Sequence, residues 1–317
     1  MRVLLIGASG HIGSFLVPEL IRRQHHVIAV SRHGCKAAYS AAAAEWDAVE
    51  ELIMDKETLY RDKALFASLK ADVILDTQSF QLPDAERMCE NLLDTDIHLI
   101  HIGTSWTIGH KLWVPVTEDH PRTELAGYGK WKAEIEEYLM NLSRTKRLRV
   151  SILHPGHITG RGWFPVNPKG TFEPEVYQTI LDGGEITLPA DGMATLQHVH
   201  AGDLARLICA CIAKPEKSVG ESFFATAADA LTLRGFAEQL YAGFGKQPNI
   251  RYADWDTFIA SVPDQFRKES QDHIRHSPVC SMEKARYLLG FTPEYRAFDA
   301  VMDAITCQLE NGGLTLH

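Results

Sequence analysis

Residues 3–13 read VLLIGASGHIG, an apolar run that continues directly into three glycines with the spacing G-x-x-G-x-x-G. This pattern is typical of a strand that turns sharply into a helix and binds a dinucleotide at the turn. Gly7 permits the tight turn, Gly10 lets the backbone approach a pyrophosphate, and Gly13 lets the helix pack against the strand. The helix N-terminus offers free N–H groups and partial positive charge to the phosphates. We expect the same loop to contribute Ser9, His11 and Ile12 to the site.

Apolar runs rich in β-formers alternate with helix-like segments along the first half of the chain. Such alternation predicts an α/β fold of the Rossmann type, a doubly wound parallel sheet with helices on both faces. Residues 51–55 are a candidate third strand. The other predicted strands are 2–6, 27–31, 72–76, 97–102 and 149–154, and the predicted helices lie near 12–23, 57–69, 83–94 and 125–142.

The composition of the chain changes after these elements. A chain of 317 residues with 45% hydrophobic content is long enough for a nucleotide-binding domain and a smaller lobe. Between Gly160 and Asp191, Gly, Pro and aromatic residues interrupt regular structure, and an apolar strand and helix then return. We therefore assign residues 1–160 and 196–215 to a dinucleotide-binding Rossmann domain, and residues 161–195 and 216–317 to a C-terminal substrate-binding lobe.

Charge and hydropathy argue against several classes of partner. The net charge is −9, and the short basic stretch 144–149 is typical of a solvated helix end, so we expect no nucleic-acid partner. Neither a leader segment nor an apolar run of about 18 residues is visible, so we expect a cytoplasmic protein without a membrane partner. The six cysteines are scattered without a C-x-x-C spacing, and we expect them to be reduced and mostly buried.

Tyr128 and Lys132 lie four residues apart in the helix-forming segment GYGKWKAEIEEYL. Both side chains should project from one helix face. A lysine ammonium beside a phenol favours the phenolate, which lowers the tyrosine pKa toward the range in which it exchanges protons with a substrate hydroxyl. The spacing by itself also fits a Tyr–Lys pair on a helix surface.

A second group of polar residues supports the interpretation of Tyr128 and Lys132 as catalytic residues. The predicted strand at 97–102 is followed by Gly103, Thr104 and Ser105. Ligands meet parallel sheets at the carboxyl ends of the strands, so hydroxyls at this point are candidates for contact with a substrate. A strand-end cap is the structural alternative.

The order of these motifs resembles that of the extended short-chain dehydrogenases/reductases, and the chain is similar to the NAD-dependent epimerase/dehydratase family. The resemblance covers about residues 1–215, and the remainder only loosely through KARYLLGFTP at 284–293. The motifs are the glycine loop, Thr104-Ser105, YGKWK at 128–132, HPGHITG at 154–160 and HVHAGDLA at 198–205.

The resemblance implies roles for these positions. Tyr128 would be the catalytic acid/base, and Lys132 would lower its pKa and bind the nicotinamide ribose. Thr104 would donate a hydrogen bond to the substrate oxygen, with Ser105 as the alternative. The segment around Pro155 would lie near the nicotinamide.

The end of the predicted second strand bears on cofactor choice. An acidic residue there would bind the 2′-hydroxyl of NAD, whereas a basic one accommodates the phosphate of NADP. The chain has Ser31 and Arg32, which favours NADP, with NAD as the alternative and a solvated loop arginine as the structural one. Asp55 resembles an aspartate of the family that contacts adenine, but it would look the same as a helix N-cap.

Two departures from the family pattern affect function. Where the family commonly has a stretch like His-Leu-Ala-Ala, residues 76–80 read DTQSF, so backbone contacts of Thr77 and Gln78 to the cofactor are expected while their side-chain roles stay open. The family's 4,6-dehydratases typically place two acidic residues after the threonine. Here Ser105 and Trp106 follow, which disfavours water elimination.

The remaining candidates concern metal and substrate. His198 and His200 alternate along a predicted strand, but no third ligand is spaced to complete a site, so we expect no metal. Arg161 and Trp163 would suit an anionic or nucleotide-bearing substrate, with exposed loop residues as the alternative.

Taken together, the sequence predicts hydride transfer at a carbinol or carbonyl carbon of a nucleotide-sugar-like or other small substrate. The net reaction is an epimerisation or a reduction, and the sequence leaves these two, the substrate and the stereochemistry open. A non-catalytic NAD(P)-binding sensor or an RNA-associated protein on the same fold is the alternative. The resemblance also suggests a homodimer formed through helices that flank the active site.

Overall fold

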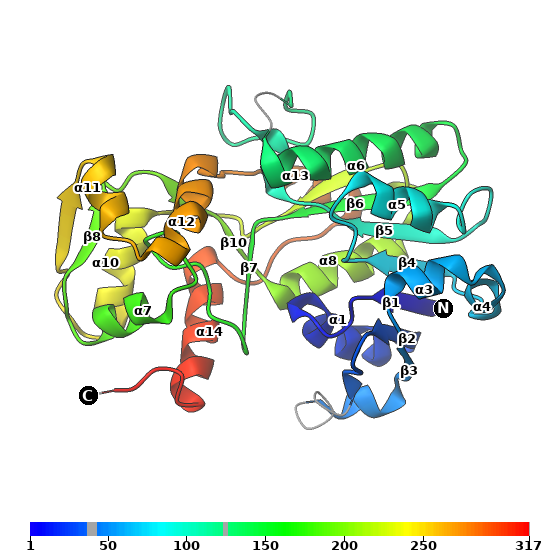
Figure 1. Cartoon of the computed structure of the whole chain (residues 1–317), viewed down its shortest axis with the longest axis horizontal. Helices are drawn as coiled ribbons and strands as arrows, with labels where there is room; N and C mark the ends of the chain where they lie inside the picture. The colour runs from blue at the N-terminus through cyan, green and yellow to red at the C-terminus, as the bar shows by residue number, and fades with distance from the viewer. Residues whose placement is uncertain (37–42, 123–125, 317) are drawn as a thin grey trace.

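A parallel sheet forms the centre of the larger group of elements in the computed structural model, which describes residues 1–36, 43–122 and 126–316 (Figure 1). Within this part of the chain, seven strands lie in the order β11-β6-β5-β4-β1-β2-β3. The strand order reverses between β1 and β4, and ligands of such sheets bind outside the carboxyl ends of the strands at that point. The strands are β1 (Arg2–Ile6), β2 (His26–Ser31), β3 (Glu50–Ile53), β4 (Val73–Asp76), β5 (His98–Ile102), β6 (Arg149–Pro155) and β11 (Ser222–Ala225).

Helices cover both faces of this sheet. The helix α1 (His11–Arg22) packs with α8 (Ala201–Ala213) on one face, where Leu16 and Val17 are fully buried. The other face is covered by α3 (Lys56–Arg61), α4 (Lys63–Ser68), α5 (Leu82–Cys89) and α6 (Gly127–Arg144). Strands buried on both faces read as continuous apolar runs, and VLLI of β1 is such a run. The predicted doubly wound α/β fold is confirmed.

Several element boundaries differ from the predicted ones, and two of the departures have a local cause. The helix expected near 57–69 is divided at Asp62, which ends α3 and caps α4 by accepting a hydrogen bond from Leu65 N at Oδ1, 2.9 Å away. A side-chain acceptor at this position favours the start of a new helix over continuation of the old one. The strand β11 was not predicted, because its four residues, SFFA, are too few to show a period.

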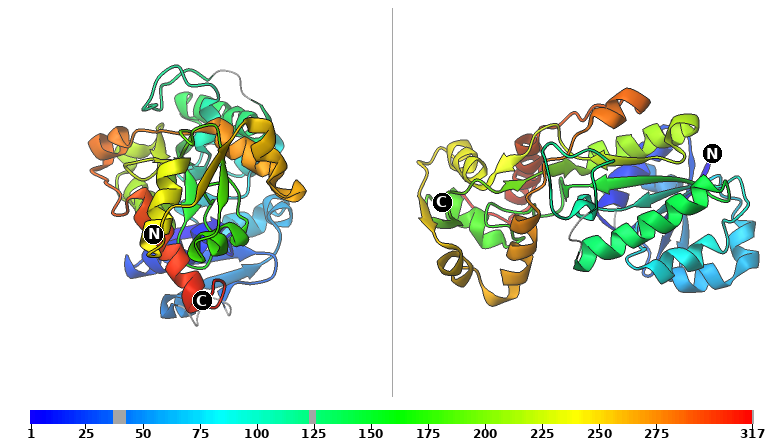
Figure 2. Two further views of the ribbon diagram at one scale, coloured as in Figure 1. Left: turned by 90° about the vertical axis from the view of Figure 1, so that its left-hand side faces the viewer. Right: turned by 90° about the horizontal axis from the view of Figure 1, so that it is seen from above.

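A second group of elements lies at the other end of the long axis (Figures 1 and 2). It has its own core, in which Phe236, Tyr241 and Phe258 are fully buried. β8 pairs with β13 in parallel, and β9 pairs with β12 antiparallel. Its elements are α7 (Pro174–Leu181), β8 (Ile186–Pro189), β9 (Thr195–Leu196), β12 (Leu231–Thr232), α10 (Leu233–Gly243), β13 (Ile250–Ala253), α11 (Trp255–Ala260), α12 (Asp264–His276) and α14 (Ala297–Glu310).

Shorter elements connect the two groups or close the sheet. The strands β7 (His157–Thr159) and β10 (His198–His200) form a small parallel pair. The helix α13 (Glu283–Leu289) contacts β11 of the central sheet and α8, which covers that sheet. Both α13 and β11 lie within residues 216–317, which the sequence analysis assigns to the substrate-binding lobe. That division of the chain stays a prediction. The others are α9 (Pro215–Ser218) and the 3₁₀ helices η1 (Ala44–Ala48) and η2 (Ser105–Ile108).

The six cysteines are all free and buried, as expected. Of the helices in the described ranges, none combines the length and apolar character that crossing a bilayer requires.

Candidate functional site

Two cavities lie at the carboxyl ends of the central strands. The first, of about 390 Å³, is lined by Thr104, Tyr128 and Lys132 among others, and we call it the Tyr128 cavity. The second, of about 430 Å³, is lined by the glycine loop and Arg32, and we call it the Arg32 cavity. The turn after β4 borders both cavities, since Thr77 lines the first and Gln78 the second.

The predicted site residues divide between these cavities. Two glycine-loop residues, Gly13 and His11, are absent from both linings among the described residues, and their surroundings are given below. The Tyr128 cavity brings together Ile12, Thr77, Thr104, Ser105, Tyr128, Lys132 and Pro155, and the Arg32 cavity brings together Gly7, Ser9, Gly10, Ser31, Arg32, Asp55 and Gln78.

The glycine loop has the backbone that its sequence predicts. Gly7 has a φ of 89°, a left-handed conformation that favours glycine, and its N–H donates to Val30 O at 3.1 Å. A Cβ on Gly13 would lie 1.9 Å from Ala8 O, so this glycine allows α1 to pack against the backbone of the loop itself. A Cβ on Gly10 would have Gly7 O as its nearest neighbour, at 3.7 Å, so the space beside this residue is open. Gly10 is also the N-cap of α1 and offers no side-chain oxygen to its first N–H groups.

Tyr128 stands in the first turn of α6, and its ring meets the edge of Trp106 with the centroids 6.1 Å apart. Close approach of α6 to η2 depends on Gly129, whose Cβ would lie 2.5 Å from Trp106 O. Burial raises the pKa of Tyr128 to about 12. The cofactor-free chain therefore holds this phenol protonated at neutral pH, and the lowering expected from Lys132 stays a prediction.

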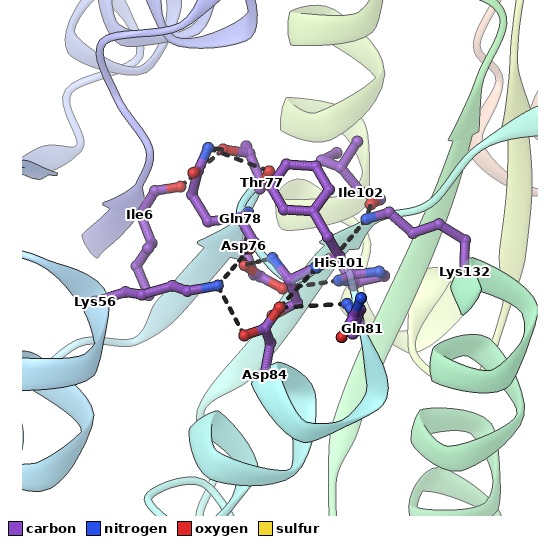
Figure 3. A network of polar contacts seen from close by, with 12 residues as sticks. Ile6, Lys56, Asp76, Thr77, Gln78, Gln81, Asp84, His101, Ile102 and Lys132 are labelled. Atoms are coloured by element: carbon purple, nitrogen blue, oxygen red, sulfur yellow. Dashed lines mark hydrogen bonds and ion pairs between the residues drawn. The ribbon is translucent and has the colours of Figure 1, made fainter. Parts of the chain in front are cut away.

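Lys132 lies one turn further along α6 and is 2% exposed. Its Nζ donates to Ser79 O at 2.6 Å and to Ile102 O at 2.7 Å (Figure 3). Burial lowers the pKa of Lys132 to about 8, and the carboxylate of Asp76 opposes this fall. Two of the three N–H bonds of the ammonium are thus committed to main-chain carbonyls, and one is left for a group in the cavity.

Thr104 is the N-cap of η2, and its Oγ1 accepts a hydrogen bond from Trp106 N at 3.3 Å. Its own N–H donates to Nδ1 of His154, on the neighbouring strand β6, at 3.3 Å. Ser105 follows as a buried residue of η2 and lines the same cavity. Both hydroxyls are therefore placed at the end of β5, where the sequence predicted a substrate contact.

A buried polar chain behind Thr104 was not predicted. Nε2 of His154 lies 3.1 Å from Oε1 of Glu136, and Arg122 donates to both carboxylate oxygens of Glu136 at 2.7 and 2.8 Å. Burial by itself would raise the pKa of Glu136, but His154 and Arg122 outweigh it and lower the pKa to about 2. Glu136 shares the helix face of Tyr128 and Lys132 at a spacing of four residues, and this spacing is the signal that the sequence offered.

The Arg32 cavity contains charges of both signs. Asp55 is the N-cap of α3, accepting from Thr58 N at 2.9 Å, so it acts as a helix cap and also lines the cavity. Lys56 donates to Gln78 O at 2.7 Å and pairs with Asp84 at 3.0 Å. Arg32 is exposed and lines the cavity.

Arg161 and Trp163, the two loop residues predicted to contact the substrate, lie outside the described lining of both cavities. Trp163 stacks on His11 with centroids 4.1 Å apart and planes 17° from parallel. Burial and the neighbouring His200 lower the pKa of His11 to about 4. Arg161 forms an ion pair with Glu310 of α14. Contact of these two residues with a substrate therefore stays a prediction.

The paired histidines of β10 have protein partners. Nε2 of His198 lies 3.0 Å from Val166 O, and Nδ1 of His200 accepts from Gly202 N at 3.1 Å. Nε2 of His200 faces Asp303 at 3.2 Å. Among residues 1–36, 43–122 and 126–316, no cluster of three or more His, Cys, Asp or Glu side chains has an arrangement that could hold a metal.

The second group of elements contributes Phe172 and His273 to the lining of the Tyr128 cavity, and no sequence pattern predicted their position there. His273, on α12, meets Trp106 at a centroid distance of 5.3 Å, and His276 stacks on the same indole at 4.0 Å with planes 4° from parallel. Burial lowers the pKa of both imidazoles. Phe172 and His273 therefore line the cavity directly, whereas His276 supports it from outside by stacking on Trp106.

Comparison with known proteins agrees with this arrangement. Residues 3–224 match the NAD dependent epimerase/dehydratase family. UDP-glucose 4-epimerase of Drosophila melanogaster is 28% identical over 267 residues, which cover 70% of this chain and 75% of that protein. Two solved structures share the fold.

The first of these is UDP-glucose 4-epimerase from Thermotoga maritima with UDP-glucose, which has a TM-score of 0.72 at 18% identity and matches 98% of this chain and 99% of that one. The second is dTDP-glucose 4,6-dehydratase from Bacillus anthracis in complex with NAD, with a TM-score of 0.76 at 17% identity over 99% of this chain and 98% of that one. The family match covers well over half of the sequence. It includes the glycine loop, Thr104, Ser105, Tyr128 and Lys132. The chain belongs to the NAD dependent epimerase/dehydratase family.

Proposed function

We propose that this chain is an NAD(P)-dependent enzyme that transfers hydride at a carbinol or carbonyl carbon, with Tyr128, Lys132 and Thr104 as its catalytic residues. The observation that carries the proposal is that these three side chains line one cavity, next to the cavity that the glycine loop lines. Membership of a family of NAD-dependent epimerases and dehydratases supports the same conclusion.

The residues present fit a dinucleotide. The open space beside Gly10 and the uncapped N-terminus of α1 suit a pyrophosphate, which needs backbone N–H donors at close range. Arg32 and Asp55 line the end of the site where the ribose and adenine would lie, and Lys132 and Pro155 line the end for the nicotinamide.

The catalytic residues divide the proton chemistry between them. A nicotinamide bound in the Tyr128 cavity would supply or accept the hydride. Tyr128 would exchange the proton of the substrate hydroxyl, for which its pKa must fall from about 12 once the cavity is filled. Lys132 is the cation that lines this cavity in the described structure, and its charge favours the phenolate. Thr104 would orient the substrate oxygen, with Ser105 as the alternative donor.

A nucleotide sugar or a related small carbonyl compound is the proposed substrate class. The Drosophila relative is named as a UDP-glucose 4-epimerase, and the Thermotoga structure holds UDP-glucose. If the keto product is reduced on its other face before release, the net reaction is an epimerisation; if it leaves, the net reaction is an oxidation or reduction. Water elimination is disfavoured because Ser105 and Trp106 follow Thr104 in place of acidic residues.

For the cofactor we propose NADP ahead of NAD. Arg32 lines the adenosine end of the site, where a guanidinium can form charge-assisted hydrogen bonds to a 2′-phosphate. Against this, the Bacillus anthracis neighbour is described as a complex with NAD. NAD therefore remains the alternative.

Fluorescence titration of the purified protein with NADPH and NADH tests the proposal, after the preparation has been checked for a dinucleotide that copurifies. Preferential and reversible binding of NADPH supports a reductase, and retained NAD supports an epimerase that recycles its cofactor. The Gly10→Ala variant is the control for binding at the loop. Failure of wild-type protein to bind either dinucleotide would overturn the enzymatic proposal.

A further inference from the structure

Asp76 and His101 are two fully buried polar residues in the segments that hold Lys132, and neither has a role in the proposed chemistry. Asp76 is the last residue of β4, and His101 is its register partner on β5. Oδ2 of Asp76 lies 2.8 Å from Nδ1 of His101, and both residues are 0% exposed (Figure 3). A buried carboxylate is costly unless it is hydrogen-bonded and compensated in charge, so its partners define what it does.

The other oxygen of Asp76 orders the turn that follows β4. Oδ1 accepts hydrogen bonds from Gln78 N at 2.9 Å and Ser79 N at 3.0 Å. These two bonds fix the orientation of the peptide groups of the turn. The carbonyl of Ser79 then accepts from Lys132 Nζ, and the carbonyl of Gln78 accepts from Lys56 Nζ.

The second acceptor of Lys132 also lies next to this pair. Ile102 O, 2.7 Å from Nζ, belongs to the residue that follows His101 on β5. Each of the two carbonyls that hold the ammonium is therefore attached to a segment that Asp76 or His101 anchors. The position of Nζ in the cavity depends on both segments.

Several charged groups act on Lys132. Asp84 of α5 favours its charged form, and Lys56 of α3 opposes it. Tyr128, on the same helix, is protonated, and the Phe80 ring lies 5.2 Å from Nζ. Of the groups that act on Lys132, Asp76 contributes most to its charged form.

Within that pair the negative charge resides on Asp76. Burial by itself would raise the pKa of Asp76, but the hydrogen bond and charge of His101 and the charge of Lys132 lower it well below its ordinary value. Burial and Lys132 lower the pKa of His101 despite the neighbouring carboxylate. At neutral pH the pair therefore consists of a carboxylate and a neutral imidazole, with a net charge opposite to that of Lys132.

We propose that Asp76 is the positioning residue and the buried counter-charge of Lys132, and that His101 holds its carboxylate in place. This inference rests on the proposed function of Lys132 at the nicotinamide end of the site. It gives a role to the sequence DTQSF at 76–80, at which the chain departs from the common family pattern.

Titration of ε-¹³C-labelled lysine by NMR tests the proposal without a substrate or cofactor. The Lys132→Arg variant assigns the signal, which should titrate near pH 8 in the wild-type chain. In Asp76→Asn the amide oxygen still accepts from Gln78 and Ser79, but the charge is lost. We expect the Lys132 pKa to fall by roughly one pH unit or more.

The control variant is Asp94→Asn, which removes a carboxylate from an exposed ion pair with Arg147. It should leave the Lys132 signal unchanged. A Lys132 signal that titrates at the wild-type pH in folded Asp76→Asn would overturn the proposal, as would an equal fall in both variants.

A second variant decides the question if Asp76→Asn does not fold. His101→Gln retains the carboxylate of Asp76 and replaces the neutral imidazole by an amide whose N–H can still donate to that carboxylate, so the Lys132 pKa should stay at its wild-type value. A fall in this variant would overturn the proposal. Dinucleotide titration of the wild-type chain is the separate measurement that decides the proposed function, so the two failures are distinguishable.

Discussion

The main-chain N–H of Thr104 donates to Nδ1 of His154 across the β5–β6 boundary. Because Nδ1 accepts this hydrogen bond, a ring proton resides on Nε2, which faces Glu136. His154 thus links Thr104 to Glu136, which lies on the same helix, α6, as Tyr128 and Lys132. All three proposed catalytic residues therefore depend on α6 for their position.

Loss of this link should change the response of the protein to acid. The pKa of Glu136 is about 2 in the folded chain, against the ordinary value of 4.5 expected for this side chain in the unfolded chain. A carboxylate whose pKa is depressed stabilises the fold above its unfolded pKa, and the contribution is lost as the pH falls toward the folded pKa. Glu136→Gln should lower the free energy of unfolding at neutral pH by on the order of 3 kcal/mol and flatten its decline between about pH 4.5 and about pH 2. Urea denaturation across this range measures both effects, and Glu137→Gln, an exposed neighbour, should change neither.

Removal of the Tyr128 hydroxyl should abolish most turnover and leave dinucleotide affinity intact. General acid–base catalysis contributes about 10²- to 10⁴-fold in rate, so Tyr128→Phe should lose a factor in this range. The assay is turnover of whichever compound reacts in a screen of UDP-sugars and small carbonyl compounds. Tyr287→Phe, at a side chain that is 88% exposed, is the control. Unchanged turnover in Tyr128→Phe would favour a non-catalytic dinucleotide-binding protein.

Two glycines of the loop should respond differently to the same substitution. Gly13→Ala places a Cβ 1.9 Å from a backbone carbonyl, so it should cost about 1–3 kcal/mol or more in stability. Gly10→Ala meets no protein atom closer than 3.7 Å, so it should retain stability while its methyl group occupies the space proposed for the pyrophosphate. Thermal melts and dinucleotide titrations of the two variants separate these effects. Normal dinucleotide affinity in Gly10→Ala would place the pyrophosphate elsewhere.

Arg32→Ala should change cofactor preference. Charge-assisted hydrogen bonds contribute about 1.5–3 kcal/mol, so NADPH affinity should fall about 10- to 100-fold while NADH affinity changes little. Arg61→Ala, at the exposed end of α3, removes a comparable charge outside the described lining of the cavity. An equal loss for both dinucleotides in Arg32→Ala would contradict the preference for NADP.

Local patterns predicted the fold because they determine it. The apolar run before Gly7 is typical of a buried strand once the glycine loop follows it, and the Gly10–Gly13 spacing is typical of a helix that begins close to the loop backbone. The same holds for Tyr128 and Lys132, whose shared face follows from helical geometry.

Residues that depend on register between distant strands were not predictable. Asp76 and His101 are 25 positions apart and meet only because β4 and β5 pair in a particular register. Phe172 and His273 reach the cavity from another group of elements, and no period in the sequence records that approach. The raised pKa of Tyr128 was not predicted for a similar reason, because it results from burial by residues that are distant in the sequence.

The turn after β4 has a consequence for how this protein can be redesigned or can diverge. Lys56 and Lys132 donate hydrogen bonds to the adjacent carbonyls of Gln78 and Ser79 in this turn. Lys56 lines the Arg32 cavity, and Lys132 lines the Tyr128 cavity. A substitution at Lys56, in the Arg32 cavity, would therefore disturb the position of Lys132 as well. Changes at this turn are therefore expected to affect both cavities together, whereas a substitution at Arg32, which has no part in the turn, can alter cofactor preference without disturbing Lys132.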